Sequence, residues 1–588
     1  MKRRILVWTG TIGLLLAACG PAATATPVPT TSVAAVATAT PATSRPTPVG
    51  GLPTSTPQPT AAATVAPTGA KSGGTVKMIA DYREPRSWDG WQIKSGSRDV
   101  RTRHNMVFSM LFVNPATPQT DCRLSVTQEL VKSWQWLRDD LLEIKILEGV
   151  KFHNKAPVNG RELTAEDVAW SANQFVIKDT IKGLEPLAPF VTKVEATGPY
   201  TVQFQTKGPQ PLLVSEGLTD KYGALVVPRE VVDDKGRWND PAKSYIGSGP
   251  FMFEKHIPGI STNFVKHPAY FKKGLPYLDA VRFMVMPDVS TRIATLRSGA
   301  IDLVFSPIPA AIALDLKKGS GVNIQSCPPA TTYAGRMQFL TDQPPFNDVR
   351  VRRALQMSID RDGLVKSILL GQGITAPHSP REVLNHQPGW DELPPEVAQW
   401  VKYDPQRAKQ LVAEYKAEQP GKFPTEVGLF LSTGRSSPFP EMAEAMVSLL
   451  QAVGFNAKPH WVPEIEWTHF ISTGDFGKDQ LAFGPLNFDS PLDSLAYWWS
   501  KSYPATNRSH IKDSEVDRLI DSFMRETDLK KGELIYKQLV IRVLDQAWEP
   551  AAGAYPLEFY GSRDYVKNFR GGDQYYTSTT TEVLWLDK

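Results

Sequence analysis

Short segments in which hydrophobic and polar residues alternate occur at several places in the chain, and they predict strands. The alternation covers residues 142–147 and residues 200–205, and the second segment follows a Thr-Gly-Pro turn. A two-residue period places every second side chain on the same face of a strand. Residues 281–285 show the same pattern. These three segments therefore predict half-buried β-strands.

A helical segment and a further strand follow residues 281–285. Residues 291–298 predict a helix that Gly299 ends, and residues 301–305 predict the next strand. Glycine commonly ends a helix because it adopts a positive φ without steric cost. A strand, a helix and a strand at this spacing indicate a crossover unit with parallel strands.

Two helix starts are clear from their capping residues. In LTAEDVAWSANQF, Thr164 precedes a helix and Asp167 lies three residues further on, which is the spacing of a capping box. In FNDVRVRRALQMSID, Asn347 or Asp348 stands at the N-cap, and apolar residues recur on one side of the helix that follows. Both segments have a sufficient structural explanation, so neither identifies a function by itself.

The N-terminus has the pattern of a secretory signal. A basic stretch at residues 2–4 precedes an apolar run over residues 5–18, which is too short to span a bilayer. The run closes with Leu-Ala-Ala-Cys at residues 16–19, which resembles a bacterial lipobox. We expect residues 1–18 to be a lipoprotein signal peptide and Cys19 to carry the lipid. The alternative is an ordinary signal peptide in which Cys19 is incidental.

Residues 19–72 differ in composition from the rest of the chain. From Gly20 onwards they consist almost wholly of Pro, Thr, Ala, Ser and Val, and Arg45 and Lys71 are their only charged residues. Such a segment cannot bury a core, so we expect a disordered tether. A flexible chain of about 50 residues has an end-to-end distance of roughly 40 Å, which lets a folded module reorient at a membrane surface.

Residues 73–588 are too many for a single hydrophobic core, and two or three packed units are expected. The formal net charge of +4 is small for 588 residues, and the basic residues are dispersed, so nothing indicates a nucleic-acid-binding surface. No second hydrophobic run is long enough to cross a membrane. Cys122 and Cys327 could pair outside the cell, but two thiols so far apart in sequence are weak evidence for a disulfide. We expect both to be unpaired.

Four longer stretches contain sequence motifs that are informative when they are taken together. The first, residues 130–175, contains a tryptophan-bearing strand, the turn GVKFH and the helix start LTAEDV. The others are residues 245–288 with GSGPF and PYLDAVRF, residues 291–305 with RSGAIDLVF, and residues 345–373 with DVRVRRALQMSIDR. In this order they resemble family 5 of the bacterial extracellular solute-binding proteins, which are the oligopeptide, dipeptide and nickel binders of ABC importers. YDPQRAKQLVAEY at residues 403–415 is a weaker match.

The resemblance implies the α/β fold of the type II periplasmic binding proteins, with two lobes around a cleft and an extra domain inserted in the first lobe. The expected limits are residues 73–113, 241–330 and 546–588 for lobe one, residues 114–240 for the extra domain, and residues 331–545 for lobe two. The chain crossings near residues 330 and 545 would form a hinge. Ligand binding between the lobes would then favour a closed state.

The same resemblance implies a substrate-binding lipoprotein of an ABC importer. It would capture an extracellular solute, for which an oligopeptide is the first expectation and an oligosaccharide the alternative, and deliver it to permease subunits that work with ATPases. We expect a monomer that is held at the outer face of the cytoplasmic membrane only by its lipid anchor. No nucleic acid, resident cofactor or metal site is expected. Other members take nickel or heme, but no cluster of ligand residues in the sequence argues for either.

A secreted hydrolase is the main rival from another functional class. The chain contains neither G-x-S-x-G nor H-E-x-x-H, and GDFGKD lacks the spacing of a P-loop. Asp489 and Asp493 form a pair of nearby acids, but Asp493 suits the third position of a helix with Ser490 as its cap and Pro491 first. His153, in the GVKFH turn, is interpreted as a loop residue of the fold. We therefore expect no enzymatic activity. A ligand sensor without a transporter is a third hypothesis.

Candidate ligand contacts lie between Gly484 and Pro491. Peptide-binding members of the family commonly hold an aspartate against the ligand's amino group, four residues before a proline. This alignment puts Asn487 at that position and Gly484 where the family has a tryptophan. An asparagine cannot supply a charge-assisted hydrogen bond, although Asp489 could substitute, and Phe488 lies between the two. We predict that a free α-amino group is not a dominant determinant of affinity.

Aromatic residues are the second set of candidates. The chain has 15 tryptophans, and relatives that bind oligosaccharides use aromatic platforms and neutral amides. We include Tyr82, Trp88 and Trp498 among the predicted ligand contacts. Packing in the core or between domains is the alternative for most of these rings. In the helix after the candidate loop, Leu492, Leu495 and one tryptophan are expected to face the interior.

Overall fold

The computed structural model of the chain describes residues 69–79, 84–85, 88, 98–113, 127–174, 190–219, 224–232, 240–319, 321–328, 335–380, 386–434, 437–475, 477, 480–485, 491–502, 507–571 and 581–588. All of them belong to the unit that runs from Leu52 to Lys588. The predicted signal peptide, Cys19 and most of the predicted tether lie outside the described residues.

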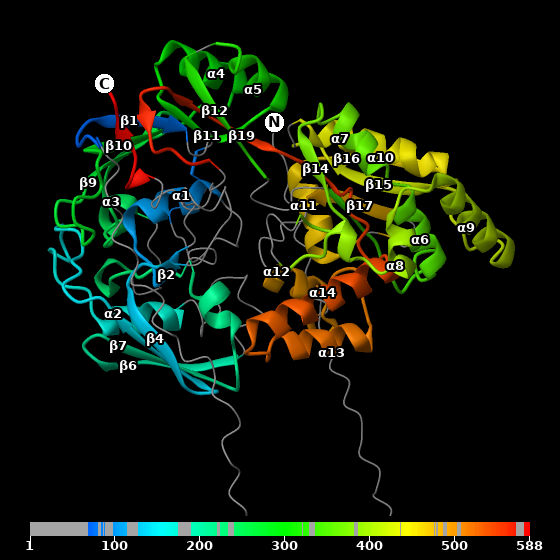
Figure 1. Cartoon of the computed structure of the whole chain (residues 1–588), viewed down its shortest axis with the longest axis horizontal. Coiled ribbons are helices and arrows are strands. Elements are labelled where there is room, and N and C mark those ends of the chain that lie inside the picture. The colour runs from blue at the N-terminus through cyan, green and yellow to red at the C-terminus, as the bar shows by residue number, and fades with distance from the viewer. Residues whose placement is uncertain are drawn as a thin grey trace, which may run out of the picture. The chain divides into compact units, whose positions relative to one another are not determined.

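The first large sheet has seven strands in the order β12-β19-β11-β1-β10-β9-β8 (Figure 1). These strands are β1 (Thr75–Ile79), β8 (Phe251–Ile257), β9 (Ser261–Lys266), β10 (Ala280–Met284), β11 (Leu303–Ile308), β12 (Val322–Cys327) and β19 (Glu558–Arg563). β1 pairs in parallel with β10 and β11. β9 and β19 run antiparallel to their neighbours. Segments from three distant parts of the sequence therefore build one sheet.

The predicted crossover unit is confirmed in this sheet. β10 and β11 both run parallel to β1, and α4 (Val289–Ser298) lies between them in the sequence. Asp288 caps α4 by accepting a hydrogen bond from the backbone N of Thr291 at 2.7 Å. Gly299 ends the helix with a φ of +77°. α4 and α5 (Ala310–Leu316) pack against strands at the β12–β11 side of the sheet (Figure 1).

An antiparallel sheet in the order β4-β5-β7-β6 is formed by the earlier alternating segments. Its strands are β4 (Val131–Arg138), β5 (Leu141–Ile146), β6 (Val191–Gly198) and β7 (Thr201–Thr206). In β5, Leu142 and Ile144 are fully buried, and α2 (Ala165–Ala172) packs on β6 and β7. The strands predicted over residues 142–147 and 200–205 are thus confirmed to within a residue.

The second large sheet has four strands in the order β13-β17-β15-β16. These strands are β13 (Gly335–Gln338), β15 (Val427–Ser432), β16 (Ala457–Val462) and β17 (Gln480–Pro485). β15 pairs in parallel with β16 and β17, whereas β13 runs antiparallel to β17. α10 (Phe439–Ala452) joins β15 to β16 and buries Met442, Met446 and Leu450 at four-residue spacing. One hydrophobic cluster includes this sheet, α10, α6 and α9.

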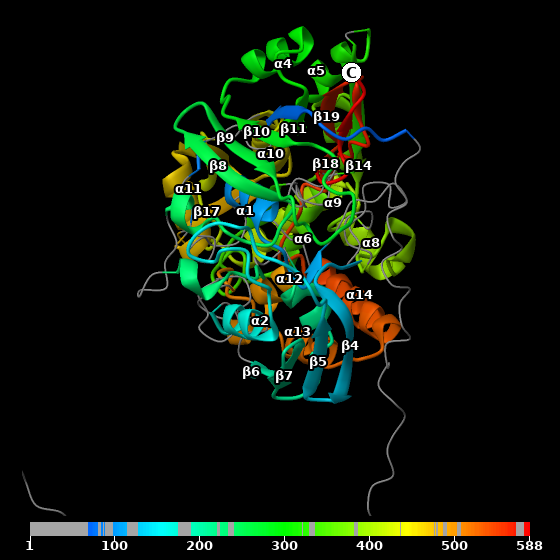
Figure 2. The same cartoon turned by 90° about the vertical axis from the view of Figure 1, so that its left-hand side faces the viewer.

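Helices lead into and out of this second sheet. α6 (Val349–Met357) is capped by Asp348, one of the two predicted caps, which accepts a hydrogen bond from the backbone N of Arg350 at 2.8 Å. After β17 come α12 (Pro491–Trp498), α13 (Ser514–Phe523) and α14 (Leu529–Gln546). α13 and α14 pack side by side (Figures 1 and 2).

The chain passes between the two large sheets twice. β12 of the seven-stranded sheet is followed by β13 of the four-stranded sheet, and after α14 the chain returns as β19. On the way back, Ala551 forms an antiparallel bridge with Arg336 of β13. The crossing near residue 545 runs through described residues, whereas residues 329–334 of the other crossing lie outside them. The predicted hinge and lobe limits stay a prediction.

Shorter elements complete the described fold. They are α1 (Arg98–Val107), β2 (Phe112–Val113), β3 (Thr127–Gln128), η3 (Leu213–Gly217), η5 (Arg229–Val231), α3 (Pro241–Ser244), α7 (Arg361–Ser367), β14 (Gly373–Thr375), η6 (Trp390–Glu392), α8 (Pro395–Val401), α9 (Pro405–Glu418), α11 (Glu464–Thr473), η7 (Ser500–Ser502), β18 (Ala554–Pro556), β20 (Val566–Lys567) and β21 (Trp585–Leu586). Among the described helices, none has the length and apolar character that a membrane span requires.

The expectation of unpaired cysteines was wrong for Cys327. This residue, at the end of β12, is disulfide-bonded, and its partner lies outside the described residues. Besides Cys327 the chain contains only Cys19 and Cys122. Sequence separation misled the prediction because a disulfide depends on the distance between two residues in space and not along the chain.

Candidate ligand-binding site

The predicted ligand loop lies between two described elements. β17 ends at Pro485 and α12 begins at Pro491, so the predicted helix start at the proline is confirmed. Asn487, Phe488 and Asp489 lie outside the described residues, as does Tyr82. Their contact with a ligand stays a prediction.

Trp498, at the end of α12, is a buried hydrogen-bond donor. Its side chain has no exposed surface, and its indole N–H donates to Oε2 of Glu549 at 2.8 Å. The ring centroid lies 5.3 Å from that of His378 in an edge-on contact. Leu492 and Leu495 are also fully buried, so the predicted interior face of this helix is confirmed. A ligand contact of Trp498 stays a prediction, and in this structure the ring offers no exposed platform.

Trp88 packs in an aromatic group. Its ring centroid lies 5.2 Å from Tyr245, 5.9 Å from Phe253 and 4.9 Å from His256, each in an edge-on arrangement. Its backbone carbonyl accepts a hydrogen bond from the hydroxyl of Tyr245 at 3.3 Å. The packing alternative therefore has direct support at this position, while a role in ligand binding stays a prediction.

Sequence analysis did not identify a polar group on β13. Arg336 of β13 bridges Ala551, and Met337 N donates to Pro550 O at 3.0 Å. In an antiparallel pair this register places Gln338 opposite Glu549, and residues two apart on a strand share a face. Arg336, Gln338 and Glu549 therefore project from one face, which we call the β13 face. All three residues are at most 2% exposed.

Arg336 is held by hydrogen bonds on this face. It donates to Nε2 of His378 and, at 2.7 Å, to Oγ of Ser379. His378 Nδ1 lies 3.1 Å from Oε1 of Gln387, so the ring accepts at Nε2 and donates at Nδ1 as a neutral imidazole. Burial and the neighbouring Arg336 keep the pKa of His378 well below its ordinary value. The arginine is therefore the cation of this group.

Glu549 is the carboxyl that faces Arg336. Its Oε2 accepts the hydrogen bond from Trp498, whereas no described residue bonds to its Oε1. Burial raises the pKa of Glu549, and the charge of Arg336 opposes that rise. Neither amide atom of Gln338 has a hydrogen-bond partner among the described residues. The face thus combines two groups of opposite charge type, Arg336 and Glu549, with polar atoms that have no described hydrogen-bond partner.

A second buried charged cluster lies elsewhere and is fully paired. Lys272 Nζ lies 2.9 Å from Oε1 of Glu582 and 3.7 Å from Oε1 of Glu129. Oε2 of Glu129 accepts from Met110 N at 2.7 Å, and the Tyr270 hydroxyl donates to Oε2 of Glu582 at 2.7 Å. Burial raises the pKa of Glu129 to about 7, against the opposing charge of Lys272.

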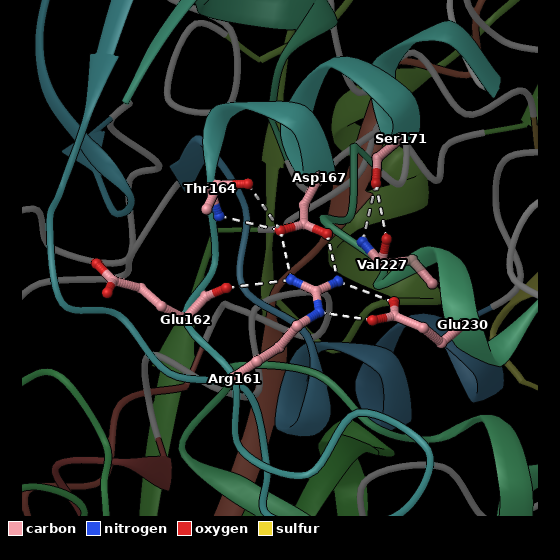
Figure 3. A network of polar contacts seen from close by, with 7 residues as sticks. All are labelled: Arg161, Glu162, Thr164, Asp167, Ser171, Val227 and Glu230. Carbon is pink, nitrogen blue, oxygen red and sulfur yellow. Dashed lines mark hydrogen bonds and ion pairs between the residues drawn. The ribbon is translucent and has the colours of Figure 1, made fainter. Parts of the chain in front are cut away.

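The helix start LTAEDV is part of an ionic network (Figure 3). Asp167 accepts a hydrogen bond from the backbone N of Thr164 at 3.0 Å, the half of a capping box that its position predicts. Both of its oxygens also accept from Arg161, at 2.8 and 2.6 Å. The same guanidinium donates to Glu230 at 2.6 and 2.8 Å. These contacts give the motif a structural role.

His153 of the GVKFH turn is a buried structural residue. Gly247 N donates to its Nδ1 at 3.3 Å, and its Nε2 lies 3.2 Å from Gly249 O. Its ring centroid lies 4.6 Å from that of His267, and burial keeps the pKa of His153 well below its ordinary value. The interpretation as a residue of the fold has this support. Among the described residues, no group of His, Cys, Asp and Glu could hold a metal ion.

The amino-acid sequence matches the profile of a known protein family. The sequence profile described as bacterial extracellular solute-binding proteins, family 5, middle region, matches residues 125–505. The chain belongs to this family. Its members are solute-binding proteins, and all four stretches from which we inferred the resemblance fall within the matched region.

Relatives in the family are named for different ligands. Heme-binding protein A of Haemophilus influenzae is 27% identical and the match covers 76% of this chain and 83% of the relative. The oligopeptide-binding protein AppA of Bacillus subtilis is 26% identical over 81% of this chain and 85% of the relative. The Escherichia coli dipeptide-binding protein is 25% identical over 71% and 79%.

Solved structures show the same fold. The chain superposes on AppA from Bacillus subtilis in complex with a nonapeptide with a TM-score of 0.70 at 22% identity, covering 88% of this chain and 100% of that one. AgaA from A. tumefacien R10, in complex with agropinic acid, gives a TM-score of 0.70 at 21% identity and covers 88% and 99%. The predicted α/β fold of a two-lobed type II periplasmic binding protein is confirmed.

Proposed function

We propose that this family 5 protein captures an extracellular oligopeptide and delivers it to the permease of an ABC importer. The observation that carries the proposal is the family match over residues 125–505 together with peptide-binding relatives that align with most of the chain. The solved relative that holds a nonapeptide supports a peptide of several residues. No catalytic role is part of the proposal, since the family is one of substrate-binding proteins.

Capture depends on a hinge in this proposal. The connections from β12 to β13 and from α14 to β19 are the two chain crossings between the large sheets. A ligand that contacts both lobes stabilises the closed state by its higher affinity for that state. The closed form then docks on the permease.

Attachment to the membrane is assigned to the N-terminus. The lipobox-like residues 16–19 and the Pro/Thr/Ala-rich residues 19–72 support a lipid at Cys19 and a tether behind it. Two or more acyl chains give firm anchoring, whereas one gives only marginal binding. Replacement of Cys19 by Ser is expected to release the protein from the membrane fraction, and retention in that fraction would contradict the anchor.

Calorimetry with the full chain tests peptide capture. A panel of peptides from two to nine residues is titrated with a free amino group and again after N-acetylation. We expect binding by members of the panel, with similar affinity in both forms because Asn487 replaces the family's amine-binding aspartate. Absence of binding across the panel would overturn the peptide proposal, and a large loss on acetylation would overturn the role assigned to Asn487.

Genetic deletion tests delivery. Uptake of a radiolabelled peptide that binds the protein should be lost when the gene for this protein or the genes for its permease are deleted. Uptake that depends on the permease but not on this protein would contradict the proposed partnership. A strain with an unrelated importer deleted serves as the control.

A further inference from the structure

Buried polar side chains normally have hydrogen-bond partners, because an unpaired buried donor or acceptor costs free energy. On the β13 face, neither Oε1 nor Nε2 of Gln338 has a partner among the described residues, and neither does Oε1 of Glu549. Both side chains are only 2% exposed. Water from the bulk solvent therefore does not satisfy these atoms in this conformation.

α12 adds a third such side chain. Ser494 stands four residues before Trp498, so the two occupy the same side of the helix. Trp498 points at Glu549, with which it forms a hydrogen bond of 2.8 Å. Ser494 is fully buried, and its Oγ has no partner among the described residues. β13, α12 and the segment after α14 thus each contribute one side chain with unused hydrogen-bonding capacity.

The charges of the group restrict what it can bind. Arg336 is a buried cation whose charge acts on the nearby Glu549, and His378 is neutral. A ligand ammonium would add a second cation beside Arg336 and leave the Gln338 N–H donors without an acceptor. A carboxylate would meet Glu549. An uncharged group with its own donor and acceptor matches the amide of Gln338, the carboxylate oxygen and the hydroxyl without burying a net charge.

We propose that Gln338, Glu549 and Ser494 form a ligand-recognition site for an uncharged polar segment that carries both a hydrogen-bond donor and an acceptor. The backbone amide within an oligopeptide is such a group. The choice of an oligopeptide as the ligand rests on the proposed function. The site lies beside the two chain crossings, since Gln338 ends β13 and Glu549 follows α14. Opening of the hinge would expose it and closure would bury it.

A side-chain rotation that joins Gln338 to Glu549 is the competing explanation, and stability distinguishes the two. Gln338→Met removes the amide but keeps the length of the side chain. Gln356 is the matched control, because it is 1% exposed and its Nε2 donates to Trp400 O at 3.2 Å and Leu544 O at 2.9 Å. Without ligand, Gln356→Met should lower the Tm, whereas Gln338→Met should leave the Tm unchanged or raise it. A similar drop in both variants would overturn the inference.

Affinity is measured on the same full-length variants. The probes are the N-acetylated peptides from the calorimetry panel and, as a second source of uncharged polar groups, maltooligosaccharides. Gln338→Met should weaken every probe that binds by about tenfold or more, Glu549→Gln should retain much of the binding because an amide oxygen still accepts, and Gln356→Met should have no effect. Unchanged affinity in Gln338→Met would overturn the site.

The outcome also separates this inference from the proposed function. Wild-type binding of maltooligosaccharides but not of peptides, lost in Gln338→Met, would support the site and reject the peptide. Peptide binding that is unaffected by Gln338→Met would support the proposed function and reject the site. If no probe binds, the mass of the ligand that co-purifies with the wild type is measured by native mass spectrometry, and its retention by Gln338→Met would overturn the site.

Discussion

Two buried charged clusters in this protein differ in how completely their polar atoms are paired. In the Glu129–Tyr270–Lys272–Glu582 cluster each charged group has a partner among the described residues. On the β13 face, Gln338 and Glu549 keep atoms without a described partner although both residues are more deeply buried than those of the paired cluster. A paired cluster stabilises a single packing arrangement, whereas an incompletely paired one has hydrogen-bonding capacity that a ligand can use.

The largest expected effect tests the paired cluster. Lys272→Met leaves Glu129 and Glu582 without their shared cation, and removal of one partner from a buried ion pair costs about 3–5 kcal/mol. The free energy of unfolding, measured by urea denaturation, should fall by this amount. Lys132→Met is the control, because the Lys132–Glu148 pair is 59% and 60% exposed and should contribute less than about 1 kcal/mol. Equal losses would contradict the comparison.

The pH dependence of the free energy of unfolding tests the paired cluster in a second way, through the titration of Glu129. The folded-state pKa of Glu129, about 7, lies above its ordinary value of 4.5. The folded protein therefore binds more protons between these values and loses stability as pH rises through them. A shift of this size corresponds to about 3 kcal/mol. Burial lowers the pKa of His153 and of His267, so their contribution falls as pH drops below about 6.5. Burial also raises the pKa of Glu549, which contributes a decline of the same sign, so a substitution is needed to separate the contribution of Glu129.

Glu129→Gln is the variant that isolates this titration. It should remove the part of the decline in the free energy of unfolding that Glu129 causes between about pH 4.5 and 7, so that the free energy of unfolding depends less on pH over this range than in the wild type. Chemical denaturation at half-unit pH steps provides the measurement. A decline of unchanged size in the variant would assign the titration to another group.

Trp498→Phe tests the described hydrogen bond to the β13 face. Loss of the indole donor leaves Oε2 of the buried Glu549 without a partner and should cost about 2 kcal/mol. Trp467→Phe is the matched change, because Trp467 is equally buried but donates to the neutral carbonyl of Phe483 at 3.3 Å. Its cost should be about 1 kcal/mol. The opposite ranking in thermal unfolding would show that Glu549 is not the stronger acceptor.

The smallest effects are expected from two serines. Ser171 is fully buried, and its hydroxyl exchanges hydrogen bonds with Val227 at 3.1 and 3.0 Å (Figure 3). Ser171→Ala should cost about 1–2 kcal/mol. Ser494→Ala, at an equally buried hydroxyl without a described partner, should change the free energy of unfolding by less than about 0.5 kcal/mol. A large loss in Ser494→Ala would show that this hydroxyl is paired.

Local features of the fold could be predicted from the sequence. Asp288, Asp348 and Gly299 act within a few residues of their own position, and the alternation in β5 and β7 is a property of each strand alone. The family resemblance extended this to the two-lobed fold. The position of Gln338 opposite Glu549 could not be predicted. It depends on the register between two segments whose residues are more than two hundred positions apart. A lone glutamate before a proline has no local signal for such a role.

The position of β19 has a consequence for biosynthesis. This strand pairs with β11 on one side and with β12 on the other, yet it is formed by residues 558–563 of a 588-residue chain. Until the ribosome has released that segment, β11 and β12 both present open edges that can pair with another chain. The protein therefore completes its first sheet only after residues 558–563 have been translated, long after β11 and β12, and a chain terminated before β19 would be prone to aggregate.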